Sequence, residues 1–106
     1  MSEYVNSKSK EVKIALIKKA KNCKSTYYSE IMNEFHISRR WIGKILFCVA
    51  DSCHSNKEPI LAALVEYKNG GIGAGYDSVV KKYGADIDFY KEQEKCFKYW
   101  KNKDIS

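Results

Sequence analysis

Three cationic side chains near the middle of the chain have the spacing to bind phosphate. Arg39, Arg40 and Lys44 follow Ser38, and residues four apart on a helix share a face, so Arg40 and Lys44 would lie together. A guanidinium makes bidentate hydrogen bonds to phosphate or guanine, and the free amides at a helix start also favour phosphate. These residues predict a nucleic-acid-binding helix that begins at Ser38, with the four side chains in contact with DNA.

A second group of cations precedes these residues. From Lys8 to Lys24 there are seven lysines and one acidic residue, Glu11, while the whole chain has a net charge of +6. Such a field concentrates polyanions without sequence specificity. A lysine-rich solvated helix has the same composition and stays open as the alternative. The predicted phosphate contacts in this region are Lys18, Lys19 and Lys21.

Other reactive side chains indicate neither catalysis nor a bound metal. Cys48, Cys53 and His54 offer ligands, but the cysteine spacing is wider than in the usual zinc pair, and no fourth ligand is apparent. No Ser/His/Asp triad or carboxylate pair is recognisable, and His36 lies at a turn where bonding to the backbone is the expected role. We therefore expect a non-enzymatic protein without cofactor or metal, whose cysteines are free thiols.

The elements that would position these residues begin with helices. A basic helix is expected from Ser9 to about Lys21, after a flexible N-terminus at residues 1–8. Thr26 can cap a second, short helix, and residues 36–38 form a tight break.

A third helix should start with Ser38 as its N-cap and end near Cys53. Its apolar residues recur at the three- and four-residue spacing of a core-facing stripe, namely Ile42, Ile45, Leu46, Val49 and Cys53. Arg40, Lys44 and Phe47 would share the opposite, outward face.

The pattern changes after Pro59. Alternation within residues 60–68 predicts a strand, Asn69-Gly70-Gly71 predicts a turn, and residues 71–76 can return as a second, irregular strand. The loop at 69–75 would form a wing against the DNA backbone. Its predicted contacts are Lys68, Asn69, Gly71 and Gly73.

The chain then returns to helix. A helical turn at 77–83 should stop at Gly84, and Asp88 can cap a C-terminal helix. One face of that helix would hold Phe89, Gln93, Cys96 and Trp100. The order of elements predicts an α+β fold, specifically a mostly helical winged helix-turn-helix with a small β-hairpin and a C-terminal helix, as a single domain over residues 9–106.

Size and composition agree with one cytoplasmic globular domain. The chain has 106 residues, of which 44% are hydrophobic and 30% charged, which is enough for one core. The start, Met1-Ser2-Glu3-Tyr4, lacks an apolar signal core, and no apolar run reaches the roughly 18–20 residues that cross a bilayer. A cytoplasmic location without membrane contact is expected.

Residues Thr26 to Tyr76 carry a family resemblance. Thr26-Tyr27-Tyr28-Ser29-Glu30-Ile31, Arg40-Trp41-Ile42-Gly43, Pro59-Ile60-Leu61 and Gly71-Ile72-Gly73-Ala74-Gly75-Tyr76 resemble the winged-helix domain of the alkylguanine-DNA alkyltransferases and their alkyltransferase-like relatives. The resemblance implies that Tyr28 rotates a phosphate and that Arg40 fills the duplex after nucleotide flipping. The family's Pro-Cys-His-Arg nucleophile motif has no counterpart between Pro59 and Tyr67, so alkyl transfer is not implied.

A second resemblance covers the C-terminal half. Pro59 to Val65, Lys68, residues 71–76 and Lys91 to Trp100 are similar to small uncharacterised bacterial and prophage proteins with a Leu-Val-Val-x-Lys…Gly-x-Pro-Gly-x-Gly-Phe loop. Gly73 stands at the usual proline position, which leaves the loop less rigid. The resemblance implies a stand-alone accessory protein.

Two functions fit these observations. The first is non-enzymatic binding of duplex DNA. The alternative is a protein-binding inhibitor or adaptor from a phage or mobile element that acts on a host defence complex, since such a protein can dock on a nucleoprotein machine. It could form a homodimer through the C-terminal aromatic residues, whose helical spacing equally fits a core, namely Tyr90, Phe97, Tyr99 and Trp100.

Overall fold

The computed structural model describes residues 3–68, 75–101 and 103. These residues form five α-helices, one 3-10 helix and two short strands. In chain order the elements are α1 (Glu3–Lys21), β1 (Thr26–Tyr27), α2 (Tyr28–Phe35), α3 (Arg39–Ser55), the 3-10 helix η1 (Leu61–Leu64), β2 (Val65–Glu66), α4 (Gly75–Tyr83) and α5 (Phe89–Trp100).

The first helix begins earlier than its expected cap. Helix α1 starts at Glu3, so residues 3–8, expected to be a flexible segment, are instead its first turns. Val5 is buried there, and Ser9 lies inside the helix, where its hydroxyl donates to the Asn6 carbonyl at 2.9 Å. The prediction of an N-cap at Ser9 was wrong because Val5 extends the apolar stripe of the helix toward the N-terminus.

Helices α2 and α3 follow the expected helix-turn-helix order. Tyr27, one residue after the predicted cap, occupies the N-cap position of α2, while Thr26 belongs to β1 and donates its hydroxyl to Glu30 at 2.9 Å. The break falls at residues 36–38 as predicted, because His36 takes the left-handed conformation with φ 55°. Ser38 is the N-cap residue of α3, but its side chain makes no capping hydrogen bond.

The small sheet is parallel, and the expected β-hairpin is therefore wrong for the described residues. Thr26 pairs with Val65 and Tyr27 with Glu66, so β2 joins a strand that precedes α2. The expected strand at 60–68 is mostly replaced by η1, all four residues of which are buried. An apolar run that is buried on every side suits a tight central turn better than a half-exposed hairpin strand.

The segment expected as the second strand is divided. Residues 71–74 lie outside the described residues, whereas Gly75 and Tyr76 open α4. The mostly helical α+β character is confirmed, while the winged-helix topology is not. Gly84 ends α4 as predicted, with φ 69°.

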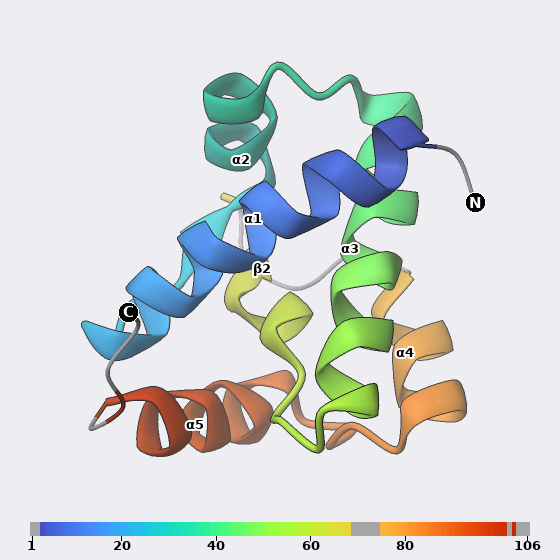
Figure 1. Ribbon diagram of the computed structural model, residues 1–106. Helices are drawn as coiled ribbons and strands as arrows, with labels where there is room; N and C mark the ends of the chain where they lie inside the picture. Colours follow the sequence, from blue (N-terminus) through green and yellow to red (C-terminus); the bar gives the residue numbers. More distant parts are fainter. Residues whose placement is uncertain (1–2, 69–74, 102, 104–106) are drawn as a thin grey trace.

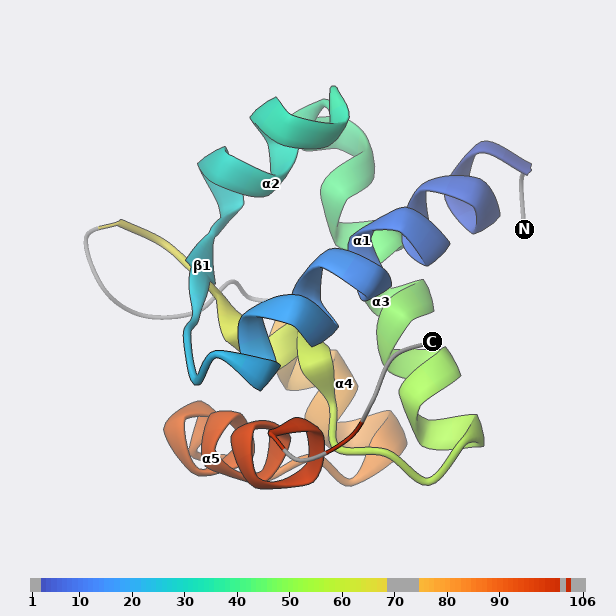
Figure 2. The ribbon, with the colours of Figure 1, turned by 60° about the vertical axis from the view of Figure 1, so that its left-hand side comes forward.

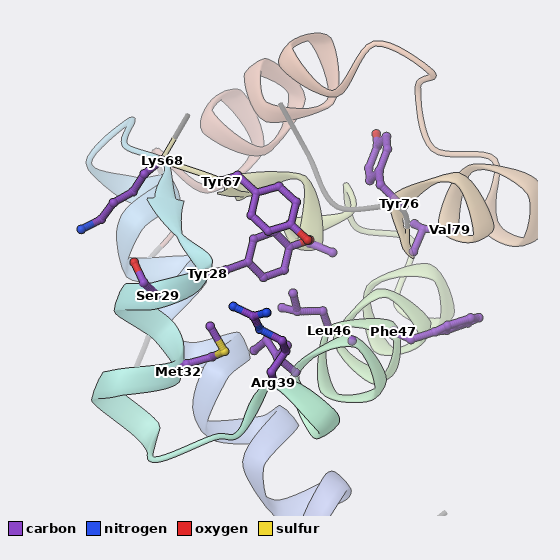
Figure 3. Close-up of a pocket in the computed structure, with 13 residues that line it drawn as sticks. Tyr28, Ser29, Met32, Arg39, Leu46, Phe47, Tyr67, Lys68, Tyr76 and Val79 are labelled. Atoms are coloured by element: carbon purple, nitrogen blue, oxygen red, sulfur yellow. The ribbon is translucent and has the colours of Figure 1, made fainter. Parts of the chain in front are cut away.

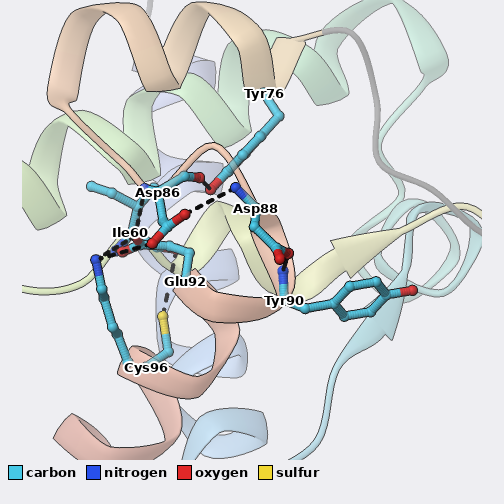
Figure 4. Close-up of polar contacts among 8 residues, drawn as sticks. Ile60, Tyr76, Asp86, Asp88, Tyr90, Glu92 and Cys96 are labelled. Atoms are coloured by element: carbon cyan, nitrogen blue, oxygen red, sulfur yellow. Dashed lines mark hydrogen bonds and ion pairs between the residues drawn. The ribbon is translucent and has the colours of Figure 1, made fainter.

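Helix α5 fastens the segment after Pro59 to the rest of the molecule (Figure 4). Asp88 caps the helix as predicted, since its carboxylate accepts from the amide of Tyr90 at 3.0 Å. The buried carboxylate of Glu92 accepts from the Ile60 amide at 2.8 Å and from the Asp86 amide at 2.9 Å. These bonds hold the start of η1 and the loop before α5 against one helix.

One hydrophobic core joins all of these elements. Helix α1 lies across α3, α4 packs against α3, and α5 packs beneath η1 and α1 (Figures 1 and 2). The five largest fully buried side chains among the described residues come from α1, α2, α3 and η1, namely Leu16, Ile31, Ile45, Leu61 and Leu64. No helix in the described parts of the chain is both long and apolar enough to cross a membrane.

Candidate nucleic-acid interface and adjoining pocket

The first turns of α3 present two exposed cations around one indole ring. The Arg40 guanidinium carbon lies 5.9 Å from the centre of the Trp41 ring, and Lys44 Nζ lies 5.0 Å from it. Trp41 is half-buried, and its ring meets Tyr4 of α1 edge-on with 5.7 Å between centroids. Packing therefore fixes the indole, and cation–π attraction holds both cations near it. The first turn of α3 contains no acidic residue.

Arg39 does not belong to this cation pair. Although its side chain is exposed, the guanidinium is directed toward the Tyr28 ring, into a pocket between α2, α3 and the residues after β2 (Figure 3). Ser38 is exposed at the N-cap position. The structure thus brings Arg40 and Lys44 together, as their spacing predicted, and assigns Arg39 to a different environment.

The pocket has a volume of about 580 Å³. Its lining comes from α2, α3, η1, the residues after β2 and α4, and its apolar residues include Met32, Leu46 and Ala62. Tyr28 and Tyr67 lie against each other along one wall, with ring centroids 4.7 Å apart and 31° between the ring planes.

Lys68 and Tyr76 also line the pocket. Lys68 is exposed at its edge. The Tyr76 hydroxyl donates to the Asp86 carbonyl at 2.6 Å, and burial raises the pKa of this phenol. The Tyr76 hydroxyl therefore donates its proton to a hydrogen bond within the protein.

The predicted phosphate contacts of α1, Lys18, Lys19 and Lys21, lie far from the Trp41 cluster. Tyr4 contacts Trp41 near the start of α1, and Lys18 is fourteen residues further along the same helix, which at 1.5 Å per residue is about 20 Å. Figure 1 shows the two ends of α1 on opposite sides of the molecule. Lys18 is exposed, while Lys19 and Lys21 are half-buried. These residues form a second basic region, not a continuation of the first.

Part of the basic charge of α1 is used inside the protein. Lys8 donates to the Phe35 carbonyl at 2.7 Å and fixes the end of α2. Lys13 Nζ lies 2.8 Å from a Glu58 carboxylate oxygen and donates to Ser52 at 2.9 Å. The local lysine surplus therefore overstates the charge that is free to attract a polyanion.

Other predicted contacts have mixed outcomes. Asn69, Gly71 and Gly73 lie outside the described residues. Phe47, expected on the outward face of α3, is half-buried, because Tyr83 of α4 meets its ring edge-on at 5.4 Å and Lys82 Nζ lies 5.2 Å from its centre.

The thiols belong to no metal-binding group in the described part of the chain. Cys53 and Cys96 are buried, and burial raises the pKa of Cys53 to about 11 and that of Cys96 further. The His54 ring lies 5.1 Å from that of Tyr83. Across residues 3–68, 75–101 and 103, no group of three or more His, Cys, Asp or Glu side chains is placed to hold a metal.

Sequence reasoning missed three residues of this region. Trp41 organises the cations, and its spacing of three residues from Lys44 would have indicated contact. Gly43 lines the pocket. A glycine inside a predicted helix often has a packing or functional reason, and this could have indicated the site. Tyr67 pairs with Tyr28 only through the fold, so no local pattern could have indicated it.

Comparison with known protein families, with curated proteins and with solved structures gave no match.

Proposed function

We propose that this protein binds duplex DNA without catalysing a reaction, and that the start of α3 is the element that meets the DNA. The observation that supports this most directly is the pair of exposed cations, Arg40 and Lys44, held beside the half-buried Trp41. Cations that are already positioned lose less side-chain freedom when they contact phosphate. The positive end of the helix dipole adds to the attraction.

The packing of α3 against the core also supports this proposal. The helix has 17 residues, and its inner side is buried in the core through Ile42, Ile45 and Val49. The outward side of its first two turns is free of acidic residues, since Asp51 is the first acid in the helix. A rigid helix with a basic exposed start is the form of the recognition helix in helix-turn-helix proteins.

A second contact is proposed at the far end of α1. Lys18, Lys19 and Lys21, with Lys68 beyond β2, would attract the phosphate backbone electrostatically. This contribution carries no sequence information, because lysine contacts to phosphate are the same for every base pair. We further propose a cytoplasmic location, where DNA is accessible.

Salt-dependent binding of a labelled 20-base-pair duplex tests this function. The test variant is Arg40→Gln/Lys44→Gln. The control variant, Lys98→Gln/Lys101→Gln, removes the same charge from exposed positions at the end of α5, which is far from the start of α3 (Figure 1). Fluorescence anisotropy between 50 and 200 mM salt, about the range over which phosphate contacts dominate, gives the affinity and its salt slope.

The test variant should lose about tenfold or more in affinity, and its log–log salt slope should fall by nearly 2, since each phosphate contact contributes about 0.9. The control variant should stay close to the wild-type protein. Equal affinities for the two variants would remove α3 from the mechanism.

The alternative is a protein-binding inhibitor or adaptor of phage or mobile-element origin. The start of α5 favours it, because Ile87 is 84% and Tyr90 55% exposed, and exposed apolar side chains of this kind occur in protein interfaces. A homodimer interface formed by the C-terminal aromatic residues of α5 is less well supported than a protein interface at Ile87 and Tyr90. Trp100 is buried, and Phe97 and Tyr99 are half-buried against the core. Two results together would favour the alternative: no complex when the protein is mixed with duplex DNA at low salt, and a homodimer in analytical ultracentrifugation.

A further inference from the structure

The pocket beside Arg39 is separate from the Arg40 and Lys44 surface and is large enough for a small molecule. Its volume of about 580 Å³ falls within the roughly 300–1,000 Å³ of small-molecule sites. Its walls are mainly apolar and aromatic, and Arg39 and Lys68 are the charged residues of its lining. This composition, an apolar cavity with a few charged groups, is typical of a binding site.

Gly43 keeps one side of the pocket open. It lies inside α3, where glycine destabilises a helix relative to alanine. A Cβ atom at this position would have no described atom within 4 Å, and no positive φ requires glycine there. Packing and backbone geometry therefore give no reason for glycine. The space that a side chain would occupy is part of the pocket.

Arg39 supplies a cation to the interior of the pocket. Its guanidinium points toward the Tyr28 ring from the side of α3 (Figure 3). Within the described residues it takes part in no hydrogen bond or ion pair. A guanidinium in this position can make a bidentate contact to a carboxylate, sulfonate or phosphate.

The aromatic wall lies next to this cation. Tyr28 and Tyr67 stack at 4.7 Å, with the Tyr28 ring on the side of Arg39 (Figure 3), and Tyr67 remains 48% exposed. Met32 and Leu46 also line the pocket near the Arg39 side chain and provide apolar contact (Figure 3). A flat ring in the pocket can contact these aromatic and apolar side chains while an acidic substituent reaches Arg39.

We infer that this pocket binds a small aromatic anion, with the acidic group on Arg39 and the ring against the Tyr28–Tyr67 pair. The inference does not rest on DNA binding, because Arg40 and Lys44 do not line the pocket. A ligand seated there would touch the first turn of α3, which connects the pocket physically with the proposed DNA surface.

Calorimetric titration with 2-naphthoate, in the absence of DNA, tests the inference. The neutral 2-naphthamide has the same ring without the charge. The wild-type protein should bind 2-naphthoate at least tenfold more tightly than 2-naphthamide, since a charge-assisted bidentate contact contributes about that factor. Arg39→Gln should remove this preference. The neighbouring Arg40→Gln is the matched control and should leave the affinity for 2-naphthoate unchanged.

Gly43 provides an independent test of the location. Gly43→Leu should weaken 2-naphthoate binding at least tenfold by filling the pocket, whereas Gly43→Ala should retain most of the binding. Both variants should melt at or above the wild-type temperature, because the added side chain meets open space in a helix. Equal affinity for the acid and the amide, or unchanged binding by Arg39→Gln or Gly43→Leu, would overturn the inference. Loss of DNA binding in Arg40→Gln with retained naphthoate binding separates the two proposals.

Discussion

Arg39 and Arg40 are neighbours in sequence that serve different surfaces. Successive residues of an α-helix are about 100° apart around its axis, so one arginine faces the pocket while the next faces solvent beside Trp41. Lys44, four residues after Arg40, returns to the same side as Arg40. The grouping of these cations therefore follows helix periodicity, whereas the choice of which one lines the pocket depends on where α2 packs.

The four thiols should differ sharply in reactivity. At pH 8, iodoacetamide should modify the exposed Cys23 quickly and the half-buried Cys48 more slowly, while Cys53 and Cys96 react only after unfolding in urea. Burial raises the pKa of Cys53 to about 11 and raises that of Cys96, so both thiols are protonated as well as shielded. Peptide mass spectrometry reports each site.

The same pKa shift predicts a loss of stability in alkali. A thiol whose pKa is higher in the folded state contributes stability that is fully present below its unfolded pKa of about 9 and is lost as the pH rises through 11. The free energy of unfolding should therefore fall across this interval. Fast alkylation of Cys53 in the folded protein at pH 8 would contradict its burial.

At the level of elements, α5 secures the irregular segment after Pro59. Gln93 donates to the Ala63 carbonyl at 2.8 Å and to Glu66 at 2.9 Å, and Glu92 accepts the Ile60 amide. A 3-10 helix and a two-residue strand have few internal hydrogen bonds of their own. Side chains of α5 therefore supply the hydrogen bonds that hold this segment in place.

Glu92→Gln tests this role. The amide cannot accept both backbone N–H groups that the carboxylate accepts, and one of its own donors would face a donor. The free energy of unfolding in urea should fall by about 1–3 kcal/mol. Glu94→Gln, on the exposed side of the same helix, is the control and should change little. Equal stability of both variants would show that Glu92 does not secure the segment.

At the scale of the whole molecule, the α1 and α3 cations proposed to contact DNA lie in two regions about 20 Å apart. The Trp41 cluster lies at one end of α1, and Lys18, Lys19 and Lys21 lie at the other. Sites this far apart act independently, so their contributions to binding should add.

A triple variant, Lys18→Gln/Lys19→Gln/Lys21→Gln, tests the second region. It should lower duplex affinity and the salt slope, and combining it with Arg40→Gln/Lys44→Gln should sum the two losses on a logarithmic scale. Anisotropy titrations of all three proteins provide the comparison. If the triple variant keeps the wild-type affinity and salt slope, these lysines are solvated side chains that do not contact DNA.

The sequence by itself determined the helices and several of their ends. The break at residues 36–38, the stop at Gly84 and the cap at Asp88 follow from side chains that act within a few residues, so local chemistry suffices to predict them. The pairing of Arg40 with Lys44 on one face has the same local origin.

Tertiary structure alone decided the strand pairing, the start of α1 and the pocket. Val65 pairs with Thr26, thirty-nine residues earlier, because burial of the apolar run before it takes the chain through the centre of the core. Val5 is held by packing that no cap signals. Tyr28, Arg39 and Tyr67 meet only when α2, α3 and the segment that follows β2 have assembled, since contacts distant in sequence depend on the packing of whole elements.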